Sequence, residues 1–208
     1  WSCFKKPCRA VTNRDLETHI MPTRRELLAR SAAAATLLAA PAVLRAAPAY
    51  QVPDRFTPKR VRVKTNFPAG ELHVVTARHF LYWTLGEGEA LRYGVAVGAA
   101  GLNFRGTAEV ARKVEWPSWT PTPEMIAREP EKYARHAGGM EGGPNNPLGA
   151  RALYLYRNGR DTAYRIHGTP QPWTIGRSVS SGCIRMVNEH VIDLYERVPM
   201  GTKVTVYS

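Results

Sequence analysis

Residues 152–168, ALYLYRNGRDTAYRIHG, decide the fold class. Leu153 and Leu155 alternate with two tyrosines, which is the period-two pattern of a strand with two different faces. Asn158-Gly159 then provides the residue pair favoured in a two-residue type I′ turn. The stretch therefore predicts a β-hairpin, and its second strand ends on a histidine followed by a glycine.

Strand-like patterns continue on both sides of this hairpin. The runs 72–85 and 90–98 flank a glycine-containing turn and predict a second hairpin, and 107–116 forms a third run. Residues 50–62 form an extended, proline-punctuated lead-in, and 203–207 predict a closing strand. We therefore expect a mainly β protein, built as two packed sheets.

One helix is expected near the carboxyl end. Residues 188–198, NEHVIDLYERV, bring Val191, Leu194, Tyr195 and Val198 to one helical face, and Asn188 is predicted to be the N-cap. A long insertion at 124–149 combines a short helical piece with a glycine-rich stretch. An insertion of this length in a compact domain is usually functional, although a packed decorative loop is the alternative.

The amino-terminal part has the pattern of an export signal. Residues 21–49 contain the pair Arg24-Arg25, then a small apolar region, then Ala47-Pro48-Ala49 as a cleavage site. The apolar region is too short for a membrane span, and the arginine pair predicts twin-arginine export. An amphipathic helix is the alternative. Residues 1–20 precede Met21, and we interpret them as a misassigned start or an artefact.

Composition excludes several classes of protein. The chain has 208 residues, of which 44% are hydrophobic and 22% charged, so wholesale disorder is excluded. Three cysteines are too few for a disulfide scaffold. Eight of the 29 basic and three of the 17 acidic residues lie in 1–49, which leaves a net charge of +7 for 50–208. Those charges are dispersed, which argues against a nucleic-acid partner and suits an anionic cell envelope.

Two residues predict covalent chemistry. Cys183 is the only cysteine after residue 49, and His167 lies sixteen positions before it. An imidazole can take the proton of a thiol, which gives a Cys–His pair. Gly182 permits a sharp turn that aims backbone amides at an oxyanion, and the Gly168 carbonyl could orient the other ring nitrogen of His167. Arg185 is placed to hold an anionic substrate group.

Each of these residues also has a purely structural interpretation. A single cysteine is more often buried filler than a nucleophile, and a histidine at a strand end is more often structural. Arg185 could simply pair with Glu189 one helical turn later. The other four histidines after residue 49 lack the spacing of metal ligands, so neither a metal nor an organic cofactor is expected. They are His73, His79, His136 and His190.

At these residues the sequence resembles a known family. The segments 144–155 (PNNPLGARALYL), 166–199 (IHGTPQPWTIGRSVSSGCIRMVNEHVIDLYERVP) and 201–206 (GTKVTV) resemble the L,D-transpeptidases with a YkuD-type catalytic domain. TPTPEMIA (120–127) and AGGMEGGP (137–144) resemble the periplasmic ErfK/YbiS/YcfS/YnhG-like branch. The resemblance covers residues 63–208 and implies a β-sandwich with one helix in the carboxyl-terminal region and a long loop insertion.

The resemblance also implies roles for individual residues. Cys183 would be the nucleophile and His167 the base, oriented by the Gly168 carbonyl, with the backbone at Gly182 in the oxyanion hole. Arg185 would contact the substrate, as would Thr169 and Ser181 beside the motif. The family commonly has Ser-His-Gly-Cys, whereas Ser181 stands here in place of that histidine. Any substrate contact of the histidine therefore passes to Ser181 or is lost.

The activity implied is acyl transfer on peptidoglycan stem peptides in the periplasm. Cys183 would form a thioester with the third residue of a tetrapeptide stem and release D-alanine, and carbapenems would acylate the same thiol. The acceptor would be a second stem, a lysine of an envelope lipoprotein or other protein, or a free D-amino acid. The alternatives are an amidase, endopeptidase or carboxypeptidase of the same fold, or a non-catalytic cell-wall-binding module.

Overall fold

A computed structural model of the protein describes residues 50–100 and 102–207. The predicted leader and the residues before it, 1–49, lie outside these ranges. The described residues belong to one compact unit. No helix in the described part of the chain is long and apolar enough to cross a membrane.

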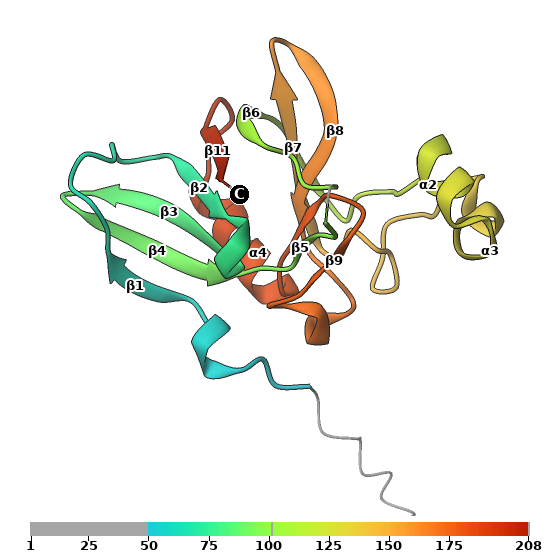
Figure 1. Ribbon diagram of the computed structural model, residues 1–208, viewed down its shortest axis with the longest axis horizontal. Coiled ribbons are helices and arrows are strands. Elements are labelled where there is room, and N and C mark those ends of the chain that lie inside the picture. The colour runs from blue at the N-terminus through green and yellow to red at the C-terminus, as the bar shows by residue number, and fades with distance from the viewer. Residues whose placement is uncertain (1–49, 101, 208) are drawn as a thin grey trace, which may run out of the picture. The chain divides into compact units, whose positions relative to one another are not determined.

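Eleven strands dominate the described residues (Figure 1). They are β1 (Lys59–Arg62), β2 (Leu72–Val75), β3 (Phe80–Gly86), β4 (Glu89–Gly94), β5 (Val97–Gly98), β6 (Gly106–Glu115), β7 (Arg151–Arg157), β8 (Arg160–His167), β9 (Ser178–Ser180), β10 (Ile184–Arg185) and β11 (Lys203–Tyr207). Nine strands form one sheet in the order β1-β4-β3-β2-β11-β6-β7-β8-β10, and β5 pairs with β9 in a second sheet. The prediction of a mainly β fold is confirmed.

The helical elements are few and short. The α-helices are α2 (Pro123–Arg128), α3 (Pro130–Tyr133) and α4 (Asn188–Arg197). The 3₁₀ turns are η1 (Asp54–Phe56), η2 (Thr76–Arg78), η3 (Ala134–His136) and η4 (Pro172–Thr174). Figure 1 shows α4 lying behind the strands, whereas α2 and α3 stand apart from them at the end of long connections.

The β7–β8 hairpin forms as predicted. Asn158 and Gly159 have φ angles of 52° and 71°, which are the positive values that a type I′ turn requires. Leu153 and Leu155 are fully buried. The hairpin therefore presents its leucines to the core, as the alternation indicated.

The predicted strand at 72–85 is interrupted, which corrects the sequence analysis. Residues 76–78 form the 3₁₀ turn η2, and His79 adopts a left-handed φ of 60°. The Thr76 hydroxyl donates a hydrogen bond to the Tyr207 carbonyl at 2.9 Å, which ties the turn to β11. The chain thus reverses there, and β2 pairs antiparallel with β3.

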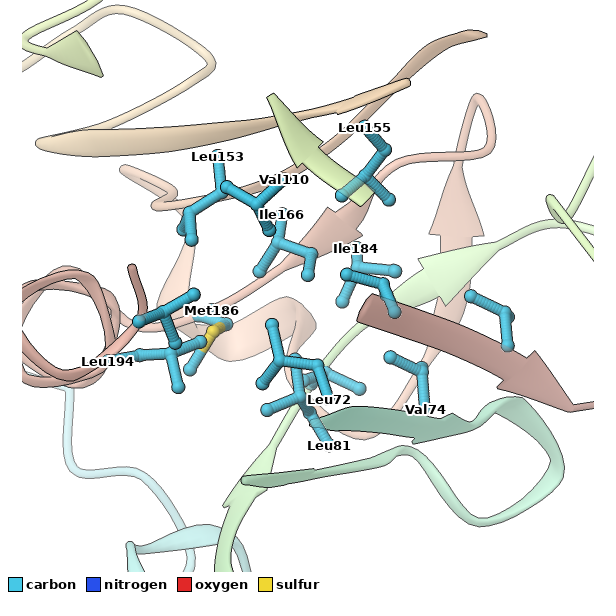
Figure 2. Close-up of a cluster of buried hydrophobic side chains, with 14 of the residues drawn as sticks. Leu72, Val74, Leu81, Val110, Leu153, Leu155, Ile166, Ile184, Met186 and Leu194 are labelled. Carbon is cyan, nitrogen blue, oxygen red and sulfur yellow. The ribbon is translucent and has the colours of Figure 1, made fainter. Parts of the chain in front are cut away.

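The core lies between the sheet and α4 (Figure 2). Leu72 and Leu81 come from β2 and β3, Ile166 from β8, and Leu194 from α4, and each is fully buried. Met186 is fully buried and lies beside Leu194. Val191, Leu194 and Val198 are buried and Tyr195 packs against the core, so the predicted apolar face of the helix is confirmed.

The predicted N-cap of this helix is wrong. Val187 is the N-cap residue, and Asn188 is the first helical residue. The Asn188 carboxamide points away from its own helix, since its Oδ1 accepts a hydrogen bond from the Ala150 amide at 3.0 Å. This long-range contact outweighs the local capping preference.

Candidate active site

Parallel pairing of two strands brings the two candidate catalytic residues, Cys183 and His167, into one site. β10 runs parallel to β8 with Ile184 opposite Ile166 and Arg185 opposite His167. The Met186 amide donates to the His167 carbonyl at 2.8 Å and fixes this register. Cys183 immediately precedes β10, so it is held beside the end of β8. Both Cys183 and His167 line the same cavity of about 720 Å³.

The tautomer of His167 follows from its hydrogen bond. Nδ1 lies 2.6 Å from the Gly168 carbonyl oxygen, which can only accept, so Nδ1 carries the proton. Nε2 is then left with a free electron pair. Burial lowers the pKa of His167 to about 3, and the charge of Arg185 acts in the same direction. The imidazole is therefore neutral at neutral pH and able to accept a proton.

A close-packed cluster holds the Gly168 carbonyl in place. A Cβ at Gly168 or at Gly149 would overlap with Asn188 Oδ1, so neither position has room for a side chain. Gly149 also has a left-handed φ of 63°. The Gly168 amide donates to the Arg151 carbonyl at 3.0 Å. Asn188 thus buttresses the segment that orients the histidine, a role that the sequence analysis missed.

The thiol of Cys183 is protonated in the resting site. Burial raises its pKa above the usual range, although the Arg165 backbone acts in the opposite direction. The side chain is partly buried, and Sγ lies 3.8 Å from the Ala163 carbonyl oxygen. The hydrogen bonds of residues 50–100 and 102–207 do not include one between this thiol and His167. The pair therefore rests as a neutral thiol and a neutral imidazole.

The turn before Cys183 is held by Ser180. Its buried hydroxyl donates to the Cys183 carbonyl at 2.6 Å and accepts from the Gly182 amide at 3.2 Å. Gly182 has a φ of 122°, and a Cβ there would lie 2.5 Å from the Tyr164 ring and 2.6 Å from the Leu102 carbonyl. The chain turns sharply at this position, and glycine is required there.

The two backbone amides at this turn, those of Gly182 and Cys183, differ in whether they already donate a hydrogen bond. The Gly182 amide is engaged with the Ser180 hydroxyl in the resting structure. The Cys183 amide makes no hydrogen bond within the described residues. The Cys183 amide is therefore free of partners among the described residues, whereas the Gly182 amide would have to leave Ser180 before it could bind an oxyanion.

Arg185 and Thr169 line the cavity. Burial lowers the pKa of Arg185, and none of the ion pairs of the described residues joins it to Glu189, the alternative that the sequence left open. The Thr169 hydroxyl accepts from the Gln171 amide at 3.1 Å and so shapes the loop at the cavity wall.

The predicted insertion, 124–149, lines part of the cavity through Met125, Arg128 and Tyr133. Trp119, which precedes the insertion, lines the cavity as well and is joined to Met140 by backbone hydrogen bonds of 2.9 and 2.7 Å. The insertion also reaches the segment before Cys183, since Arg128 Nη2 donates to the Ser181 hydroxyl at 3.0 Å. The sequence carried no signal for this contact.

Metal-ligating groups do not gather in the described part of the chain, where no three His, Cys, Asp or Glu side chains could share an ion. His73, for example, is buried away from the cavity. Its Nδ1 lies 3.0 Å from the Tyr207 hydroxyl, and its Nε2 lies 3.2 Å from a Glu71 carboxylate oxygen.

A family model described as the L,D-transpeptidase catalytic domain, YkuD type, matches residues 69–206. Among curated relatives, YbiS of Escherichia coli strain K12, named a probable L,D-transpeptidase, is 36% identical over 125 residues. That match covers 59% of this chain and 39% of YbiS. Other curated relatives are covered over 36% to 65% of their own lengths.

Two solved structures are similar as well. A Brucella melitensis protein, titled a probable carnitine operon oxidoreductase, is 50% identical with a TM-score of 0.52, over 74% of this chain and 96% of that one. L,D-transpeptidase 3 of Mycobacterium tuberculosis is 16% identical with a TM-score of 0.51, over 68% of this chain and 62% of that one, which shows a shared fold. The predicted transpeptidase-type fold is thereby confirmed.

Proposed function

Because the chain belongs to the L,D-transpeptidase catalytic-domain family, we propose that it is a cysteine-dependent acyltransferase acting on peptidoglycan stem peptides. The observation that carries this proposal is the register of β8 and β10. It sets a neutral imidazole, fixed in its Nδ1–H tautomer, and the Cys183 thiol into one cavity.

The first half of the reaction forms a thioester. His167 Nε2 takes the thiol proton as Sγ attacks the carbonyl carbon of the third, diamino-acid residue of a tetrapeptide stem, at its L-centre. The carbonyl oxygen becomes an oxyanion that the Cys183 amide stabilises, joined by the Gly182 amide once it leaves Ser180. The C–N bond to D-alanine then breaks, and His167 returns its proton to the leaving amine.

The second half resolves the thioester. An acceptor amine attacks the acyl carbon while His167 takes a proton from that amine. The C–S bond breaks, and the thiol recovers the proton. A side-chain amine of a second stem would give a 3→3 cross-link, a lysine would attach an envelope protein, and a free D-amino acid would give exchange. Water in the same role would give carboxypeptidase activity.

Export would place this activity in the periplasm. The support is the twin-arginine pattern at Arg24-Arg25, followed by a cleavage site at Ala47-Pro48-Ala49. Substrate and enzyme would then share one compartment, and the protein would cross the membrane already folded.

One assay separates this function from its alternatives. The purified chain is incubated with disaccharide-tetrapeptide, and the products are identified by mass spectrometry. Release of D-alanine with dimer formation supports transfer, and release without dimer supports a carboxypeptidase. Cleavage elsewhere supports an amidase or endopeptidase, and retention without turnover supports a binding module. The Cys183→Ala variant, which keeps the cavity but removes the thiol, is the matched control.

A further inference from the structure

The cavity carries an excess of positive charge that the acyl-transfer chemistry does not use. Its charged lining residues are Glu124, Arg128, Lys132 and Arg185, so three cations stand against one anion. The Lys132 ammonium is already paired with Glu129 at 3.0 Å. Both guanidinium groups line the cavity, and Arg128 has only a 3.8 Å contact with the same Glu129, so a ligand that enters this cavity should bring negative charge.

Arg128 differs from Arg185 in how it is held. Arg128 is the last residue of α2, a helix capped by the Thr122 hydroxyl, which accepts from the Met125 amide at 3.3 Å. Its Nη2 donates to Ser181 at 3.0 Å, and its Nε lies 3.8 Å from a Glu129 oxygen, too far for a hydrogen bond. A guanidinium has five N–H donors, so most of them remain open to a ligand.

The position of this guanidinium limits what it can bind. Ser181 precedes Cys183 by two residues, so Arg128, a residue of the insertion, contacts the chain next to Cys183 and lines the same cavity. In a tetrapeptide stem the terminal carboxylate is separated from the scissile amide nitrogen by one carbon. The side-chain carboxylate of the diamino acid lies farther along the same residue. Both are planar anions that match the two-pronged geometry of arginine.

We propose that Arg128, anchored by Ser181, is a specificity-determining residue that binds a carboxylate of the acyl-donor stem. This inference rests on the proposed function and deepens it. Ser181, which stands where the family commonly has histidine, serves here to aim a guanidinium from the insertion. The insertion is thereby part of the donor site.

The test measures donor binding separately from turnover. In the Cys183→Ala background, the affinity for the tetrapeptide is measured by calorimetry with Arg128 intact and with Arg128→Gln. We expect Arg128→Gln to weaken binding about tenfold or more, because a charge-assisted hydrogen bond is lost. Arg128→Lys should recover only part of the loss, since it keeps the charge without the fork. Arg135→Gln is the matched control and should change affinity less than about threefold, because Arg135 is an exposed cation of the same insertion that does not line the cavity.

Amidated donors identify the carboxylate. One donor carries a terminal D-alaninamide, and another carries an amide on the side-chain carboxyl of the diamino acid. The donor that lacks the recognised carboxylate should bind equally well whether Arg128 is intact or replaced by glutamine, whereas the other donor should still distinguish the two proteins. In the active chain, Arg128→Gln should raise KM for the native donor with kcat within about threefold.

These experiments distinguish failure of the Arg128 inference from failure of the proposed transferase function. Turnover with no effect of Arg128→Gln on binding or KM would overturn the inference and leave the function standing. Equal losses for Arg128→Gln with all three donors would show a structural role only and would also overturn it. Arg128-dependent, carboxylate-dependent binding without D-alanine release would support the inference and refute the transferase. Neither binding nor turnover would refute both.

Discussion

The Asn188 carboxamide oxygen accepts a hydrogen bond from the Ala150 amide at 3.0 Å, across a sequence separation of 38 residues. The same oxygen packs against the backbone of Gly149 and Gly168. The Gly168 carbonyl in turn accepts the Nδ1 proton of His167 at 2.6 Å. The first residue of α4 is thus connected to the imidazole through one buried segment of backbone.

We expect Asn188→Ala to weaken both stability and chemistry. The buried Ala150 amide would lose its acceptor, which costs about 1–3 kcal/mol of unfolding free energy. Space would also open beside Gly168, so the imidazole would be held less firmly and acylation of Cys183 should slow by about tenfold or more. Urea unfolding measures the change in stability. The rate at which imipenem, a carbapenem, acylates Cys183 measures the change in reactivity.

Asn188→Asp is the matched control for that prediction. It keeps an acceptor oxygen at the same place, and a carboxylate is favourable in the first turn of a helix. Stability and acylation should therefore stay close to those of the unaltered chain. Equal losses in both variants would show that the Oδ1–Ala150 hydrogen bond is not what matters.

Asn188 and Ala150 also show which contacts could not be predicted from the sequence. The β7–β8 hairpin was predictable because Asn158 and Gly159 determine their turn through local conformational preference. Residue type and spacing also pointed to Cys183 and His167, and the structure places both in one cavity. Asn188 has a local pattern too, that of a cap, but its partner Ala150 is distant in sequence, so the local pattern predicted the wrong contact.

The remaining differences have the same cause. The break after β2 contains neither glycine nor proline, and it depends on the contact between Thr76 and β11. The Arg128–Ser181 hydrogen bond joins residues 53 positions apart. Contacts of this kind form only when the sheet has formed, so no local sequence pattern predicts them.

Gly182→Ala should disable the site. Its φ of 122° is unfavourable for any other residue, and the added Cβ would collide with Tyr164 and Leu102. We expect a loss of about 1–3 kcal/mol in unfolding free energy and little or no acylation by imipenem, because the Cys183 turn must shift. Gly143→Ala is the control, since nothing lies within 4 Å of its new Cβ. A Gly182→Ala chain as stable and reactive as Gly143→Ala would contradict this view of the turn.

The acylation rate should be almost independent of pH between pH 5 and pH 8. Burial and Arg185 hold the pKa of His167 at about 3, so the base is neutral throughout. Burial raises the pKa of Cys183, so the thiol stays protonated. An imidazole with an ordinary pKa would lose roughly thirtyfold in rate between pH 8 and pH 5. A stopped-flow pH profile with imipenem distinguishes these cases, and a drop of that size would count against the buried base.

The same pKa predicts a pH dependence of stability. Between pH 6.5 and pH 3 the unfolded chain binds a proton at His167 and the folded chain does not, so stability is lost as pH falls through this window. His167→Gln lacks this contribution and should show a shallower decline in urea midpoint. Identical slopes would mean that His167 protonates normally in the folded protein.

Export through the twin-arginine pathway should depend on the arginine pair itself. Changing Arg24 and Arg25 together to lysine keeps the positive charge of the leader and removes the guanidinium groups that define the pattern. We expect an uncleaved precursor to remain in the cytoplasm, seen by fractionation and immunoblotting. Normal cleavage of the variant would remove the twin-arginine interpretation, although a signal peptide of another kind would still be possible.

The strongest prediction concerns Cys183, the free cysteine of the described residues. A carbapenem presents a strained carbonyl whose oxygen can enter the oxyanion site at the Cys183 amide while the thiol attacks. Intact-protein mass spectrometry should therefore show one imipenem adduct on the unaltered chain. Cys183→Ala and Cys183→Ser should show neither an adduct nor D-alanine release, because a hydroxyl has too high a pKa for His167 to activate.

The Cys183 side chain is only partly buried, so either substitution should cost no more than about 1 kcal/mol of stability. His167→Gln should keep the thiol but slow acylation by about 10²–10⁴. A buried filler would give the reverse result, with activity retained and stability clearly reduced. An adduct that survives in Cys183→Ala would assign the nucleophile to another residue and remove the mechanism built on the β8–β10 register.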